Sequence, residues 1–322
     1  MELIKYPLLF EPILKERIWG GTKLKTDLDK NISSDKTGES WELSAVKGDV
    51  SIVKNGHYKE KSLTEIIEHF KDGLLGEKVF ADFGTEFPLL FKFLDAKEDL
   101  SIQVHPNDEL AKKRHNSFGK TEMWYVMQAD ADAKIIVGFK QKSNPEQYLK
   151  HLKSNSLLKI LNEVQVKKGD VFFLETGTIH AIGAGIVIAE IQQTSDITYR
   201  IYDWDRADDK GNKRELHVDL ALEAMDYEVK QTKKEYSKYK NKSNIIVNSP
   251  YFTTCFLPVN GGLDVSKTGD SFTVYICTEG NFTFVYDKEQ YSFKKGDTIL
   301  VPACLKNYRL EGEAALLEIF IS

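Results

Sequence analysis

Four side chains in this sequence have the types and spacing of a metal site. Gln103 and His105 lie two residues apart in LSIQVHP, which in an extended strand places both side chains on one face. Glu122 opens the apolar run EMWYVM, where a carboxylate needs a partner. His180 follows a predicted turn much later in the chain. Imidazole nitrogens, a carboxylate and an amide oxygen are the ligands expected for zinc or another divalent first-row metal.

Two other interpretations of these residues stay open. A single histidine of this kind is more often a hydrogen-bonded core residue, but His105 and His180 flank separate predicted turns. Two histidines and one carboxylate also fit a non-haem iron oxygenase. A fourth ligand from Gln103 argues against that chemistry, because it leaves fewer positions for oxygen and a cosubstrate together. With neutral histidines and one carboxylate, a divalent ion leaves the site about one unit positive, which suits an anionic substrate.

Short strands separated by turns must position these side chains, with helices inserted between them. Helices are predicted near residues 62–70, 107–115 and 144–162. Ser62 and Glu65 have the capping-box spacing, and Asn107 can cap the second helix. Pro145 favours the first turn of the third, which Ser143 or Asn144 precedes. The sequence therefore predicts a helical insertion within a β-barrel domain.

An internal repeat divides the chain. VKKGDVFFLETGTIHAI and FKKGDTILVPACLKNYRL share a strand, turn and strand pattern. Counting 11 residues on from Gly169 gives His180, whereas 11 on from Gly296 gives Asn307. The second copy thus has the turns of a double-sheet barrel without the metal histidine. We predict a metal-binding domain over 1–229, an exposed linker or edge over 230–244, and a second barrel without a metal site over 245–322.

Composition narrows the function further. A chain of 322 residues suggests about two domains. With 41% hydrophobic and 29% charged residues and a net charge of −5, the chain is an unsuitable general binder of nucleic acid or membrane surfaces. No apolar run approaches the roughly 20 residues of a spanning helix. The N-terminus has an acidic second residue and no cleavage pattern, so we expect a mature cytoplasmic protein.

The cysteines support the same compartment and the same ligand chemistry. Cys255, Cys277 and Cys304 are odd in number and share no CxxC spacing, so we expect reduced core thiols. All three lie far from the predicted ligands in the sequence. The predicted site therefore uses only nitrogen and oxygen ligands.

Several motifs together carry a family resemblance. IQVHP, GKTEMWYV, ETGTIHAIGAG and AEIQQTSDITYRIYDWDR resemble the type I phosphomannose isomerases, zinc enzymes of the cupin superfamily. The resemblance runs from IWGG at 18–21 through ESWELS at 39–44 to the C-terminal barrel. It implies a mainly β fold with two cupin-type double-sheet (jelly-roll) barrels and a helical insertion. It also implies one Zn²⁺ per chain, held by the four predicted ligands.

The proton chemistry of an aldose–ketose isomerase selects further residues. Such an enzyme needs a base and an electrophile, and metal-bound histidines are unavailable as bases. Lys120 and Glu190 are the predicted proton carriers, and a desolvated lysine near a cation can have a lowered pKa. Arg200 stays protonated and fits better as a forked donor to a phosphate or enediolate oxygen. A salt bridge to Asp203 or Asp205 is its alternative role.

The resemblance assigns the substrate side as well. It implies that Lys120, Glu190 and Arg200 are catalytic, and that Trp19, Ser101 and Asp196 join Lys120 and Arg200 in contacting a sugar phosphate. Trp19 could equally be a core residue beside a tight turn, and Asp196 could be a turn residue only.

Enzyme and binding protein are the two functions to be distinguished. The resemblance implies a zinc-dependent isomerase that interconverts D-mannose 6-phosphate and D-fructose 6-phosphate by proton transfer through an enediol or enediolate. A non-enzymatic sugar-phosphate sensor on the same barrels is the alternative. Because a sensor could lose its proton carriers, the presence of Lys120, Glu190 and Arg200 favours the enzyme.

Overall fold

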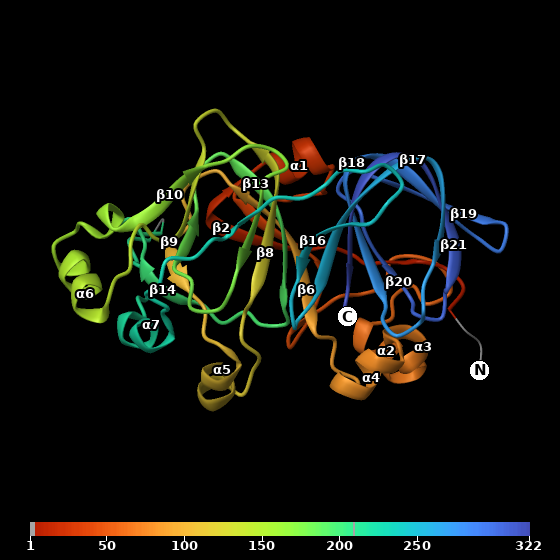
Figure 1. Cartoon of the computed structure of the whole chain (residues 1–322), viewed down its shortest axis with the longest axis horizontal. Helices are drawn as coiled ribbons and strands as arrows, with labels where there is room; N and C mark the ends of the chain where they lie inside the picture. Colours follow the sequence, from red (N-terminus) through yellow and green to blue (C-terminus); the bar gives the residue numbers. More distant parts are fainter. Residues whose placement is uncertain (1–3, 209) are drawn as a thin grey trace.

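Antiparallel strands are the main regular structure of the protein (Figure 1). The structure is a computed structural model that describes residues 4–208 and 210–322. Sheet I has the strand order β15-β11-β8-β13-β6-β3-β2. Its strands are β2 (Ile13–Gly21), β3 (Thr37–Leu43), β6 (Leu89–Ala96), β8 (Glu122–Ala129), β11 (Val171–Leu174), β13 (Ile186–Gln193) and β15 (Lys233–Lys234).

Sheet II packs against sheet I and has the order β10-β9-β12-β7-β14. Its strands are β7 (Ile102–Val104), β9 (Lys134–Phe139), β10 (Leu161–Gln165), β12 (His180–Ile182) and β14 (Tyr199–Tyr202). Trp124 and Val126 from sheet I share one buried cluster with Ile135, Val137 and Ile182 from sheet II. The two sheets therefore enclose a common core, as in a sandwich.

Helices cover the outer face of sheet II. These are α6 (Pro145–Lys153), the 3-10 turn η1 (Leu157–Lys159) and α7 (Val218–Ala224), while α5 (Asp108–His115) follows β7. Tyr148 of α6 and Ala221 of α7 belong to the same buried cluster as Ile102 and Val104 of β7. Because alternate residues of a strand face opposite sides, Gln103 between them points the other way, toward sheet I.

Sheet III forms the C-terminal part of the molecule, with the order β1-β20-β18-β21-β17-β16 and β19 on β18. Its strands are β1 (Leu8–Leu9), β16 (Asn244–Asn248), β17 (Thr253–Ser266), β18 (Thr273–Tyr286), β19 (Glu289–Lys294), β20 (Thr298–Val301) and β21 (Asn307–Phe320). Tyr275 and Cys277 face one core of this sheet, while Val274 and Ile276 face a second. That second core includes Phe91 of sheet I and so joins the two parts.

The remaining elements complete this junction. They are α1 (Lys23–Leu28), the ribbon β4 (Ala45–Val46) and β5 (Asp49–Val50), and the helices α2 (Leu63–Phe70), α3 (Asp72–Leu75) and α4 (Glu77–Phe83). Figure 1 shows α2, α3 and α4 beside sheet III, and the backbone N–H of Phe272 donates to the carbonyl oxygen of Leu75. No helix among the described residues is long and apolar enough to cross a membrane.

The prediction of a mainly β fold is confirmed, while the division into two closed barrels stays a prediction. The predicted helix over 144–162 is too long. α6 ends at Lys153, because Asn155 takes a left-handed conformation with φ 50°. The rest of the stretch forms η1 and β10, which pairs with β9.

The predicted linker and domain boundary also differ in detail from the structure. Residues 230–244 include β15, which adds to the edge of sheet I beside β11, and Thr232 is buried. At the other end of the chain, β1 pairs with β20 of sheet III. The first strand of the predicted N-terminal domain therefore lies on the C-terminal sheet.

Candidate metal centre and active site

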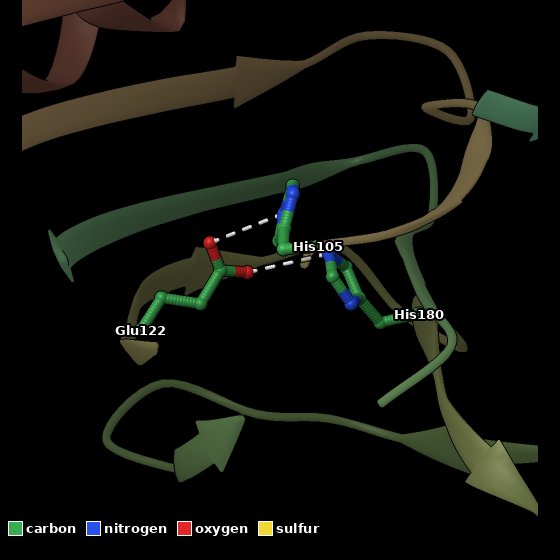
Figure 2. A group of neighbouring side chains, drawn as sticks. All are labelled: His105, Glu122 and His180. Atoms are coloured by element: carbon green, nitrogen blue, oxygen red, sulfur yellow. Dashed lines mark ion pairs between the residues drawn. The ribbon is translucent and has the colours of Figure 1, made fainter. Parts of the chain in front are cut away.

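His105, Glu122 and His180 form a buried group between sheets I and II (Figure 2). One possible ligand atom from each lies within 4.8 Å of the others. His180 opens β12 and His105 follows β7, both in sheet II, whereas Glu122 opens β8 in sheet I. The structure thus brings together three of the four predicted ligands from distant parts of the sequence.

Backbone carbonyls fix which imidazole nitrogens face this group. Nδ1 of His105 lies 2.9 Å from the carbonyl oxygen of Ile197, and Nδ1 of His180 lies 2.7 Å from that of Thr178. A carbonyl oxygen only accepts, so each Nδ1 carries the proton and each Nε2 is an unprotonated acceptor. Nζ of Lys120 lies 3.3 Å from Nε2 of His105 and can donate to it. These Nε2 atoms lie 3.5 and 3.3 Å from the Glu122 oxygens (Figure 2).

Burial keeps both histidines neutral. It lowers the pKa of His180 to about 4, and burial together with the positive charge of Lys120 lowers that of His105 well below its ordinary value. Burial raises the pKa of Glu122 to about 7, although Lys120 opposes the change. Oε2 of Glu122 forms an ion pair with Nζ of Lys120 at 3.1 Å, and Oε1 has no hydrogen-bond partner among the described residues. Unshared pairs on nitrogen and oxygen therefore face one another, which is the donor set that a divalent cation satisfies.

Gln103 lies at the edge of the same group. It is the register partner of both His180 and Arg200, and its Nε2 lies 3.3 Å from Nε2 of His180. In this orientation the amide donates to the imidazole. A half-turn of the amide places its oxygen there instead, as a metal ligand requires.

An open cavity of about 540 Å³ adjoins this group. Predicted site residues on its lining are Trp19, Ser101, Gln103, Lys120, Glu190, Asp196 and Arg200. The structure thereby gathers all the predicted substrate contacts around one space, and their roles remain predictions. Among the described residues, the lining has six lysine or arginine side chains against four carboxylates, which suits an anionic ligand.

Lys120 and Glu190 form part of a buried chain of charges. Nζ of Lys120 lies 3.1 Å from Oε2 of Glu122 and 3.9 Å from Oε1 of Glu190. Nζ of Lys92 lies 3.3 Å from the same Glu190 oxygen, and the indole of Trp124 donates to the other at 3.1 Å. The proton carriers predicted from the sequence are therefore neighbours.

The sequence suggested a lowered pKa for Lys120, but the surrounding side chains raise it. Burial alone would lower it, but the charges of Glu122 and Glu190 outweigh burial and raise it. Burial would likewise raise the pKa of Glu190, but Lys120 and Lys92 lower it instead. At neutral pH these side chains give a charged lysine beside an ionised carboxylate.

The alternative salt bridge of Arg200 does not form among the described residues. Asp203 instead pairs with Arg214 at 2.5 Å and Arg206 at 2.7 Å. Nη1 of Arg200 donates to the carbonyl oxygen of Glu215 at 2.9 Å, and its Nε is buried without a hydrogen-bond partner in the described chain. Arg200 thus retains donor capacity at the cavity.

Sequence reasoning missed much of the cavity lining. Side chains on the cavity lining that were not predicted include Lys15, Arg17, Glu39, Trp41, Lys92 and Arg214. Lys92 gave a usable signal, because it interrupts the buried apolar run of β6 and a charge there needs a partner. Arg214 gave none, since it lies in an exposed-looking charged segment.

The fold and the buried group define a class of protein: a double-sheet β protein with a candidate nitrogen- and oxygen-ligated metal centre between its sheets. Comparison with known proteins gives the family. Residues 8–152 match the phosphomannose isomerase type I catalytic domain, and residues 242–321 match the mannose-6-phosphate isomerase cupin domain. The chain belongs to the type I phosphomannose isomerase family.

Individual relatives agree over nearly the whole chain. A mannose-6-phosphate isomerase of Bacillus subtilis is 39% identical, with 96% of each chain covered. One from Streptococcus mutans is 36% identical, with 97% of each chain covered. Among solved structures, the mannose 6-phosphate isomerase from Bacillus subtilis has a TM-score of 0.88 at 34% identity, covering 97% of this chain and 99% of that one.

Proposed function

We propose that this chain is a zinc-dependent mannose-6-phosphate isomerase. The observation that carries the proposal is the adjacency of the buried histidine and glutamate group to two proton-carrying side chains on one cationic cavity. The full-length relatives bear the same activity in their names. The substrate is then the small sugar phosphate D-mannose 6-phosphate or its ketose isomer. We place the reaction in the cytoplasm on the basis of the sequence alone.

Gln103, His105, Glu122 and His180 would hold the ion. Bound there, a zinc ion would act as a Lewis acid toward the sugar oxygens at the reacting carbons. The Nε2 lone pairs of the two histidines and the buried carboxylate of Glu122, whose Oε1 has no hydrogen-bond partner among the described residues, are the features of this chain that fit such an ion. Two neutral histidines and one carboxylate provide less negative charge than a divalent ion carries, so an anionic substrate completes the balance.

Lys120 and Glu190 would move the proton between the two carbons. The reaction removes a proton next to a carbonyl, passes through an enediol or enediolate, and returns a proton to the neighbouring carbon. Oε1 of Glu190 is buried and has no hydrogen-bond partner among the described residues, so it can accept a proton. Lys120, charged and 3.9 Å away, can donate one.

Proton exchange tests the proposal directly. The zinc-loaded protein should exchange the C2 proton of mannose 6-phosphate with solvent while forming fructose 6-phosphate. Lys120→Ala and Glu190→Gln should each lower kcat by roughly 10²–10⁴-fold with a smaller effect on KM, because both act during proton transfer. A zinc-loaded parent protein that binds mannose 6-phosphate without exchange or turnover would be a sensor instead.

A further inference from the structure

A tight turn after β14 fixes the position of Asp203. The backbone N–H of Arg206 donates to the carbonyl oxygen of Asp203 at 3.0 Å, and Trp204 and Asp205 have φ values of 56° and 54°. Two successive left-handed residues closed by this hydrogen bond make a turn with the φ signs of type I′. The indole N–H of Trp204 donates to the carbonyl oxygen of Leu100 at 2.8 Å. The turn is thereby anchored to the strand region that precedes Gln103.

Buried Asp203 in turn orients Arg214. Nε of Arg214 donates to Oδ2 at 2.7 Å and Nη2 donates to Oδ1 at 2.5 Å, which is a forked two-point contact. Burial alone would raise the pKa of Asp203, but hydrogen bonds from Arg214 and Arg206 hold it below its ordinary value. In the described chain, these contacts leave Nη1 of Arg214 without a protein partner, and Arg214 lines the cavity.

The segment that carries Arg214 also supports Arg200. The backbone N–H of Arg200 donates to Nδ1 of His217 at 3.1 Å, and the N–H of His217 donates back to the carbonyl oxygen of Arg200 at 2.7 Å. Burial and then the like charge of Arg214 lower the pKa of Arg200. Arg200 and Arg214 both line the cavity, so their guanidinium groups place positive charge where an anion can bind.

We propose that Arg214 binds the phosphate group of the substrate together with Arg200, and that Asp203 is the positioning residue that aims Arg214 into the cavity. This inference rests on the proposed function and specifies its phosphate subsite. A phosphate monoester carries about −1.5 to −2 charges at pH 7 and offers three acceptor oxygens. Nη1 of Arg214, which Asp203 does not engage, and the remaining donors of Arg200 match such a group. The β7–β14 pairing keeps Arg200 beside Gln103, so the phosphate subsite adjoins the candidate metal ligands and one sugar phosphate can contact both.

Arg214→Gln and its matched control, Arg206→Gln, test the subsite. Both arginines contact Asp203, but Arg206 is absent from the cavity lining among the described residues. Loss of a charge-assisted contact in Arg214→Gln should raise KM for mannose 6-phosphate and Ki for inorganic phosphate by roughly 10- to 100-fold. The preference for mannose 6-phosphate over unphosphorylated mannose, as a ratio of kcat/KM, should fall similarly. Arg206→Gln should change none of these values by more than about threefold.

Asp203→Asn tests the positioning role. It should raise KM and Ki as Arg214→Gln does, with kcat and bound zinc retained, whereas a merely structural role would lower zinc content and kcat together. Adding Asp203→Asn to Arg214→Gln should produce little further change in Ki, because one residue acts through the other. Independent, additive losses would overturn this role of Asp203.

Failure of this inference can be distinguished from failure of the proposed function. An isomerase whose phosphate Ki and substrate preference survive Arg214→Gln would contradict the subsite alone. A rise in phosphate Ki from Arg17→Gln, also on the cavity lining, with none from Arg214→Gln would also overturn it. If Arg214→Gln abolishes phosphate binding but the parent protein has no isomerase activity, the subsite is supported and the proposed enzyme function is contradicted.

Discussion

The orientation of two imidazole rings determines the chemistry of the buried group. Ile197 and Thr178 hold the Nδ1 protons of His105 and His180, so both Nε2 lone pairs point toward Glu122. Contacts of this kind behind a ligand orient the ring and fix its tautomer. The candidate ligand set is therefore oriented by the backbone.

Metal content tests this arrangement at the residue scale. We expect His105→Ala and His180→Ala to fold but to retain little metal, because each removes one of few ligands. Asn307→Ala is the matched control, since exposed Asn307 occupies the corresponding position of the repeat. Metal analysis of the purified proteins, with circular dichroism to check folding, gives the result. Near-normal metal content in both histidine variants would refute the assignment.

Glu39 gives a pH-dependent prediction. Burial alone would raise its pKa, but Lys92 and Arg17 lower it from 4.5 to about 2. Its contribution to stability should be present above about pH 4.5 and disappear as pH falls toward 2. Glu39→Gln should therefore lower the free energy of unfolding at pH 7. The difference in this free energy between the variant and the wild type should shrink below pH 4.5. Urea unfolding midpoints at several pH values measure it, and a difference that grows on acidification would contradict the sign.

At the scale of single elements, local sequence decides where helices start. Ser62 and Glu65 complete a capping box on α2, and the side chain of Asn107 accepts from the N–H of Leu110 in α5. Such caps satisfy amide groups that have no partner inside the helix. α2 also buries Leu63 and Ile67 in the core that joins sheets I and III.

Removing the cap of α2 should weaken the fold without affecting the site. Ser62→Ala should lower the free energy of unfolding by about 1 kcal/mol, the usual cost of losing an N-cap. Ser33→Ala, at an exposed position, is the control and should have little effect. Chemical denaturation with a parallel isomerase assay checks both expectations. An unchanged unfolding midpoint for Ser62→Ala would show that the capping box contributes nothing.

At the scale of the whole molecule, a buried ion pair links the two parts. Nζ of Lys30 donates to Glu42 of β3 at 2.6 Å and to the carbonyl oxygen of Gly296, near sheet III, at 2.8 Å. Ser40 donates to the other Glu42 oxygen at 2.6 Å. All these contacts are buried, and Lys30 and Glu42 also line a cavity of about 510 Å³.

Breaking this link should destabilise the molecule strongly. Lys30→Ala leaves Glu42 buried without its cation, which typically costs about 3–5 kcal/mol. Lys294→Ala, which removes an exposed lysine that pairs with Asp29, should leave the unfolding midpoint nearly unchanged. Denaturant titration of both variants makes the comparison. Equal, small effects would mean that the interior pair does not hold the two parts together.

Local features of this protein follow from short stretches of its sequence. The spacing of Gln103 and His105 fixed their common face, because a strand alternates its side chains with a period of two. Caps fixed the starts of α2, α5 and α6, since a cap depends on residues within one turn. Motifs around Glu122 and His180 carried the family resemblance.

Which side chains share the cavity depends on long-range packing. Lys92, Glu39 and Arg17 enter it because β6, β3 and β2 are neighbours in sheet I, and strand order is set by long-range packing. Arg214 enters because Asp203, at a turn after β14, holds its guanidinium. Residues 154–165 do not continue the helix, because part of this stretch pairs with β9 as β10. This pairing outweighs the helical pattern of the sequence. Contacts across large sequence separations depend on packing energies that no short window of sequence contains.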